Sequence, residues 1–163
     1  IENRSRLAAE SLALGDFGNA EGLYASCLKG PHKTDAHLML GLAQAQFGRA
    51  DHAAAKASLE RLIAANPESR SSDGHLLYAC CLEARGDTQG ALNEFAILAD
   101  SYPGEEGRAR YAQLLQRSGR ESEAQTVYAG MLARAKVAPR YYQRDNREWI
   151  DLARAQAATA RQG

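Results

Sequence analysis

Four segments of this chain share one register, and this repetition constrains its fold more than any other feature. Each segment carries a first alanine and a second alanine twelve residues later: Ala8/Ala20, Ala43/Ala55, Ala79/Ala91 and Ala112/Ala124. A bulky apolar residue follows four positions after each second alanine: Tyr24, Leu59, Phe95 and Tyr128. The first alanines are separated by 35, 36 and 33 residues. One such match would mean little, but the joint register predicts four copies of one structural unit.

A turn is predicted between the two alanines of each segment. The turn residues are Gly15-Asp16, Ala50-Asp51, Gly86-Asp87 and Gly119-Arg120. Apolar residues on both sides recur every three or four positions, which is typical of amphipathic helices. Glycine suits the left-handed conformation that ends a first helix, and aspartate suits the cap of a second. Each segment is therefore predicted to be a helical hairpin that buries its apolar face by stacking on its neighbours.

This pattern resembles the tetratricopeptide repeat, a helix-turn-helix unit of about 34 residues. The first alanines match the small residue at the family's eighth position, and the second alanines match its twentieth. Pro67 and Pro103 match the proline that ends a repeat, whereas Pro31 lies one residue early. The chain departs from the family at Ala50, where a turn glycine is expected, and at Lys136, where a proline is expected. The usually large fourth position is also atypical in the outer repeats, where it is Arg4 and Arg108.

The resemblance covers residues 3–137 and implies an all-α fold, a right-handed superhelical stack of about four antiparallel helix pairs. We expect a single domain over residues 1–163, with repeats at about 1–34, 35–69, 70–104 and 105–138. Beyond Pro139, an apolar stripe that includes Trp149, Ile150 and Ala153 predicts one further helix to about residue 160, which would cap the stack. Because the chain begins at Ile1, we expect it to be part of a longer protein.

The resemblance also indicates where a ligand would bind, because first helices line the concave surface of such a stack. Side chains of the first helices that point away from the hairpins share one stripe by helical geometry. The predicted partner-binding residues on these stripes and beside them are His37, Leu40, Gln44, Phe47, Asp73, Leu76, Cys80, Glu83, Arg110, Gln113 and Arg117. This surface is apolar in its middle and more polar toward its C-terminal end. Such a composition suits an extended peptide or an amphipathic helix with a few apolar anchors.

The function predicted from these features is a non-catalytic scaffold that binds a protein or peptide in the concave groove. Some family members clamp a terminal carboxylate with lysine and asparagine, but the corresponding positions here include Ser5, Ala9 and Gln44, so that mode is not expected. The alternative is a module for self-association, as a homo-oligomer, or for assembly of a membrane complex through a segment outside this chain. The alanine-, arginine- and glycine-rich composition favours a bacterial source.

Charge and chemistry argue against the other function classes. Lys+Arg and Asp+Glu both number 20, and the stripes carry Asp73 and Glu83, so no basic surface for nucleic acid is predicted. Residues 1–103 hold 9 basic and 13 acidic side chains, and residues 104–163 hold 11 and 7. The four histidines and the three cysteines, Cys27, Cys80 and Cys81, show no metal-ligand spacing, so no metal or cofactor is predicted. Catalytic and phosphate-binding motifs are also absent, and no enzyme activity is expected.

No run of about 18 apolar residues predicts a membrane span, and no signal peptide is visible. The odd number of cysteines favours a reducing compartment. We therefore expect a cytoplasmic protein, tethered to a membrane only if a segment outside this chain provides the anchor.

Overall fold

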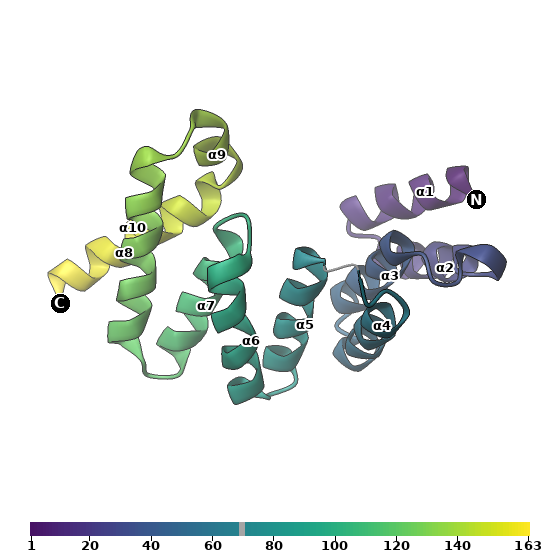
Figure 1. Cartoon of the computed structure of the whole chain (residues 1–163), viewed down its shortest axis with the longest axis horizontal. Coiled ribbons are helices and arrows are strands. Elements are labelled where there is room, and N and C mark those ends of the chain that lie inside the picture. Colours follow the sequence, from purple (N-terminus) through teal and green to yellow (C-terminus); the bar gives the residue numbers. More distant parts are fainter. Residues whose placement is uncertain (69–70) are drawn as a thin grey trace. The chain divides into compact units, whose positions relative to one another are not determined.

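The computed structural model describes residues 1–68 and 71–163 of this chain, and these residues form an all-α fold without a β-strand (Figure 1). Residues 69 and 70, at the predicted boundary between the second and third repeats, lie outside the described residues. The chain divides into two compact units, Ile1–Ala91 (unit 1) and Leu92–Gly163 (unit 2). None of the described helices is long and apolar enough to span a membrane.

The helices follow the predicted hairpins. Unit 1 contains α1 (Glu2–Ala13), α2 (Phe17–Cys27), a short 3-10 helix (Gly30–His32), α3 (Ala36–Gly48), α4 (His52–Ala65) and α5 (Ser72–Ala84). Helix α6 (Thr88–Ser101) begins in unit 1 and continues into unit 2. Unit 2 also contains α7 (Glu106–Arg117), α8 (Glu121–Val137), α9 (Arg140–Asp145) and α10 (Arg147–Gln162).

All four predicted turns have the left-handed conformation that ends a helix. The φ angles are 79° at Gly15, 62° at Ala50, 85° at Gly86 and 78° at Gly119. In each turn the next residue donates its N–H to the carbonyl five positions back, as Asp16 does to Ser11 at 2.9 Å. This hydrogen bond is typical of the Schellman motif. Ala50 adopts the same conformation although its Cβ makes left-handed φ values unfavourable.

Aspartate caps three of the second helices, as the sequence predicts. The Oδ1 atoms of Asp16, Asp51 and Asp87 accept hydrogen bonds from the N–H groups three residues later. Such a cap satisfies a donor that the helix itself leaves unpaired. Arg120 makes no cap with its side chain and instead donates to Glu123 in the first turn of α8.

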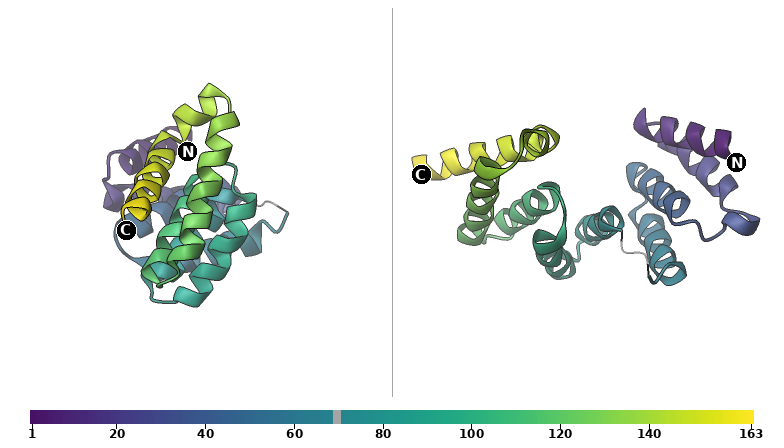
Figure 2. Two further views of the ribbon diagram at one scale, coloured as in Figure 1. Left: turned by 90° about the vertical axis from the view of Figure 1, so that its left-hand side faces the viewer. Right: turned by 45° about the horizontal axis from the view of Figure 1, so that its top comes forward.

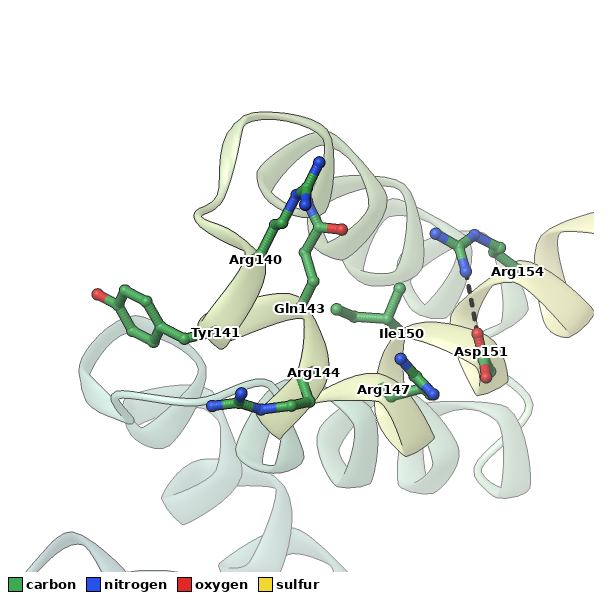
Figure 3. Close-up of a pocket in the computed structure, with 8 residues that line it drawn as sticks. All are labelled: Arg140, Tyr141, Gln143, Arg144, Arg147, Ile150, Asp151 and Arg154. Atoms are coloured by element: carbon green, nitrogen blue, oxygen red, sulfur yellow. Dashed lines mark hydrogen bonds and ion pairs between the residues drawn. The ribbon is translucent and has the colours of Figure 1, made fainter.

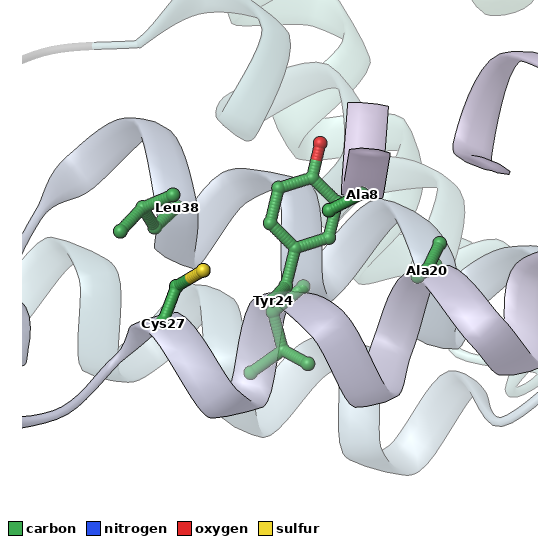
Figure 4. Close-up of a cluster of buried hydrophobic side chains, with 7 residues drawn as sticks. Ala8, Ala20, Tyr24, Cys27 and Leu38 are labelled. Carbon is green, nitrogen blue, oxygen red and sulfur yellow. The ribbon is translucent and has the colours of Figure 1, made fainter. Parts of the chain in front are cut away.

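The core of unit 1 is built around alanines and one tyrosine. Its first cluster consists of Ala8, Ala20, Tyr24, Cys27, Leu38, Leu42 and Ala45 (Figure 4). The ring of Tyr24 lies against α3 at Gly41, where a Cβ would collide with that ring. A second cluster, Met39, Ala43, Ala55, Leu59, Leu62 and Cys81, joins α3 and α4 to α5. The small residues let the helices approach closely, as the sequence pattern predicts.

Helix α10 packs on the hairpin formed by α7 and α8 in unit 2, burying Ile150 and Ala153. Both views of Figure 2 show α10, in yellow, beside the green α8. Its arrangement resembles that of α3 in unit 1, which contacts both members of the preceding hairpin, α1 and α2.

The single helix predicted over about 139–160 is in fact two helices that meet at Asn146. This residue has φ −111° and ψ 16°, outside the helical region. Its Oδ1 accepts from the N–H of Glu105 at 2.9 Å, and its Nδ2 donates to the carbonyl of Tyr142 at 3.0 Å. The side chain that breaks the helix therefore also attaches the break to the start of α7.

The carboxylate of Glu105 is fully buried beside this break. Arg134 on α8 donates to both of its oxygens, Nε to Oε1 at 3.0 Å and an η nitrogen to Oε2 at 3.1 Å. The hydroxyl of Tyr142 on α9 donates to Oε1 at 2.8 Å. Burial, and then this hydrogen bond, raise the pKa of Tyr142. Glu105 thus connects α7, α8 and α9 through one carboxylate.

Candidate partner-binding face

The first helices of unit 1 lie side by side. Helix α3 contacts α1 and α5, while α2 contacts α1 and α3, and α4 contacts α3 and α5. The predicted stripes on α3 and α5 therefore belong to neighbouring helices. We call the side of α1, α3 and α5 that carries these stripes the first-helix face of unit 1.

On α3, the predicted residues are partly accessible. His37 is exposed, and Leu40, Gln44 and Phe47 are half-buried. Leu40 and Phe47 also pack against the second core cluster. The ring of Phe47 makes an edge contact with His52, the first residue of α4, with ring centroids 4.8 Å apart. Leu40 and Phe47 therefore contribute to the core as well as to the surface. His37 and Gln44 can be substituted with less effect on the packing of the core.

On α5, burial differs among the predicted residues. Asp73 is exposed, Cys80 and Glu83 are half-buried, and Leu76 is only 7% exposed. Leu76 therefore offers little surface to a partner. Cys81, next along the helix, is fully buried, and burial raises the pKa of its thiol to about 11. A thiol with so high a pKa is a poor nucleophile at neutral pH.

The predicted residues on α7 belong to unit 2, and one of them is used within that unit. The guanidinium of Arg110 lies 5.2 Å from the ring centroid of Trp149 on α10, a cation–π geometry. Its Nε lies 3.7 Å from Glu106 Oε2. Gln113 is half-buried, and Arg117 is exposed. Arg110 therefore helps to hold α10, a role that the sequence stripe did not predict.

The side chains of these predicted stripes are chemically mixed. They include amide, thiol, imidazole, carboxylate, guanidinium and apolar groups. Among the residues that the structure describes, no group of three or more His, Cys, Asp or Glu side chains could hold a metal ion. The described cysteines form no disulfide.

Two features of unit 2 lie outside the predicted site. The first is the buried Glu105, whose burial has no local signal in the sequence. The second is a cavity of about 520 Å³ bounded by α9 and the first part of α10. Its arginines occur at positions 140, 144, 147 and 154, at intervals of four, three and seven residues. That helical spacing was visible in the sequence, but the break at Asn146 that shapes the cavity was not.

The comparisons with known proteins agree with the hairpin architecture. Residues 35–69 and 73–104 match the family model of the tetratricopeptide repeat. No curated protein matches the chain. Tetratricopeptide-repeat proteins are generally non-catalytic scaffolds that bind protein partners.

Three solved structures are similar to the chain. A crystal structure of MamA is 13% identical to this chain and has a TM-score of 0.63. The match covers 96% of this chain and 97% of the MamA chain. A second MamA crystal structure is 15% identical, with coverages of 95% and 86% and a TM-score of 0.67. A crystal structure of a Podosopora anserina putative kinesin light chain with nearly identical TPR-like repeats is 19% identical. Its coverages are 99% and 96%, and its TM-score is 0.63.

Identities this low establish the likeness of fold alone. The family match adds the repeat type for the two central hairpins, whose alanine register is the same as that of the outer two. The resemblance drawn from that register is confirmed: this chain is an all-α stack that contains tetratricopeptide repeats.

Proposed function

We propose that this chain is a protein-interaction scaffold whose first-helix face in unit 1 binds a peptide or a helix of a partner protein. The observation that supports the proposal is that α3 contacts both α1 and α5, so the first helices of separate hairpins are neighbours. A partner that spans these helices would contact residues far apart in the sequence.

The composition of this face supports a partner with few apolar anchors. Leu40 and Phe47 leave part of their apolar surface exposed, and Gln44 lies between them with an amide that both donates and accepts hydrogen bonds. An amphipathic helix or an extended segment presents apolar side chains at spacings that fit such a surface. The remaining predicted residues, His37, Asp73, Cys80 and Glu83, would form a polar rim, and Leu76 would contribute packing rather than contact. Gln113 and Arg117 of unit 2 remain proposed contacts, while Arg110 is assigned to the support of α10.

The test uses peptides selected on the intact chain from a displayed library of random twelve-residue peptides. Gln44→Arg should weaken binding of the selected peptides by about tenfold, because a cation would be buried where a neutral amide now meets the partner. Ala57→Arg is the matched control, since Ala57 is an exposed position of α4. NMR shifts caused by the peptide should map to α1, α3 and α5. Equal binding to both variants, or shifts confined to α2 and α4, would contradict the proposal.

Self-association is a second candidate function, favoured by the apolar surface of α1. Leu7 is 49% exposed, whereas at the same repeat position Leu42 belongs to the first core cluster and Tyr78 packs against the second. A helix from another copy would bury Leu7 in the same manner. Light scattering should then show a dimer or larger species that Leu7→Glu converts to monomer, and a monomer at every concentration would exclude this candidate.

A further inference from the structure

The cavity between α9 and α10 is a site of its own, separate from the first-helix face and lying wholly in unit 2. Four of its lining side chains are arginines: Arg140 and Arg144 from α9, and Arg147 and Arg154 from α10 (Figure 3). The only acidic group among the lining residues is Asp151. The site is therefore strongly cationic in a chain whose formal net charge is zero.

The charge of this cavity is only weakly compensated. Arg154 pairs with Asp151 at 2.9 Å and Arg144 with Asp145 at 3.4 Å, but the four side chains in these pairs are 59% to 71% exposed. Exposed ion pairs contribute little and exchange readily for other partners. Within the part of the chain that the structure describes, neither a hydrogen bond nor an ion pair engages Arg140 or Arg147. These two guanidinium groups are available to an incoming anion.

The floor of the cavity is held in place by contacts on its far side. Ile150 lines the cavity, yet it is 3% exposed because α10 packs on α7 and α8. Gln143 donates to the carbonyls of Ala135 and Ala138 at the end of α8, at 3.0 Å each. Asn146, at the break, bonds to Glu105. The cavity is thus organised before any ligand arrives, which lowers the entropic cost of binding.

The distribution of the arginines decides among anionic ligands. Figure 3 shows the four guanidinium groups set around the cavity rather than directed at one point. A single phosphate could engage only part of this set. Several separate carboxylates match the arrangement better, since each guanidinium can hold one in a bidentate pair. The exposed ring of Tyr141 and the floor at Ile150 would accommodate an apolar side chain between the carboxylates.

We propose that the cavity between α9 and α10 binds an acidic peptide segment of a partner protein, in which carboxylate side chains flank an apolar residue. Its carboxylates pair with Arg140 and Arg147 first and compete with Asp145 and Asp151 for Arg144 and Arg154. Nucleic acid fits less well, because the arginines are confined to two short stretches of helix and the chain has no net positive charge to attract a long polyanion. This proposal does not depend on the proposed function of unit 1, and each of the two proposals can be refuted without affecting the other.

The test measures fluorescence anisotropy of a labelled ten-residue peptide that has four glutamates around a central leucine, with the whole chain at about 150 mM salt. Saturable binding is expected below about 1 mM peptide. The same peptide with glutamine in place of glutamate should bind at least about tenfold more weakly. Inorganic phosphate and a single-stranded oligonucleotide, each at the same charge concentration, should displace it poorly. Absence of peptide binding, or stronger binding of either competitor, would overturn the assignment.

Two double variants locate the site. Arg140→Gln with Arg147→Gln should weaken binding at least about tenfold, while Arg85→Gln with Arg161→Gln, which removes the same charge at exposed positions elsewhere, should change it less than about twofold. Arg147→Lys keeps the charge without the planar fork and should give an intermediate loss. All four arginines are exposed, so folding is expected to survive, and circular dichroism checks this. Equal losses in the two double variants would show a general charge effect and would refute the site.

Discussion

Arg134 makes a bidentate ion pair with Glu105 in which the two partners are buried to very different degrees. The carboxylate is 0% exposed, whereas the arginine side chain is 42% exposed. The pair joins α8 to the residue that precedes α7, and Tyr142 and Asn146 connect α9 to the same point. Loss of Arg134 would leave the buried carboxylate with Arg108, whose Nη1 lies 3.7 Å from Oε2, as a weaker partner. Loss of the carboxylate would leave Arg134 as a cation that reaches water.

Replacement of Arg134 by methionine should therefore destabilise the chain strongly. We expect the free energy of unfolding to fall by about 2 kcal/mol, because the buried carboxylate would lose both hydrogen bonds from Arg134 and keep the more distant Arg108, at 3.7 Å, as a cationic partner. Lys136→Met is the matched control, an exposed cation two residues further along α8, and should cost less than about 0.5 kcal/mol. Urea unfolding followed by circular dichroism gives both values. Similar small losses in the two variants would show that the pair adds little.

Two glycines in helix interiors should respond to alanine in opposite directions. Gly41→Ala in α3 should destabilise by about 2 kcal/mol, because the new methyl group would collide with the ring of Tyr24 in a packed core. Gly22→Ala in α2 has open space around the added methyl group. It should stabilise by about 0.5–1 kcal/mol through the higher helix propensity of alanine. Thermal unfolding of the two variants tests the close approach of α2 and α3, and a stabilising Gly41→Ala would contradict it.

The turn at Ala50 should be improved by glycine. Ala50 has φ 62°, and a left-handed conformation costs an alanine about 1–2 kcal/mol more than a glycine, partly offset by the greater freedom of glycine in the unfolded chain. Ala50→Gly should stabilise by roughly 0.5–1 kcal/mol. The reciprocal change, Gly86→Ala, introduces a methyl group into open space and should cost about the same amount through its backbone alone. If the denaturation midpoints of Ala50→Gly and Gly86→Ala moved in the same direction, the left-handed backbone would not explain the two effects.

Stability should decrease at alkaline pH. Burial, and then the nearby Cys80, raise the pKa of Cys81 from 9.0 to about 11 in the folded chain. Below about pH 9 the thiol is protonated in both the folded and the unfolded chain, so its full contribution to stability is present. Between about pH 9 and 11 the unfolded chain loses this proton while the folded chain keeps it, so stability falls as pH rises. The loss from this group is on the order of 2 kcal/mol.

Tyrosines add to the same trend, because burial also raises the pKa of Tyr24 and Tyr128. Cys81→Ala separates the contributions. Its unfolding free energy, measured from about pH 8 to 11, should fall less steeply than that of the parent chain. Parallel pH profiles would show that Cys81 does not titrate as its burial requires.

Much of the hairpin architecture could be predicted because its determinants are local. The left-handed turns at Gly15, Gly86 and Gly119, and the caps at Asp16 and Asp51, depend on residues within one or two helical turns. The candidate face was harder to predict. Helical periodicity predicts Leu76 and Arg110 as surface residues of the candidate stripes. The burial of Leu76 and the contact of Arg110 with Trp149 depend on residues distant in the sequence.

The sequence by itself determined that this chain folds as stacked helical hairpins, since the alanine register, the turn residues and the apolar spacing are each readable within a single repeat. Only the tertiary structure decided what happens beyond the fourth hairpin. Asn146 divides α9 from α10 through hydrogen bonds to Glu105 and Tyr142. That break and the buried carboxylate arise from contacts between residues 29 to 41 positions apart, which no local pattern encodes.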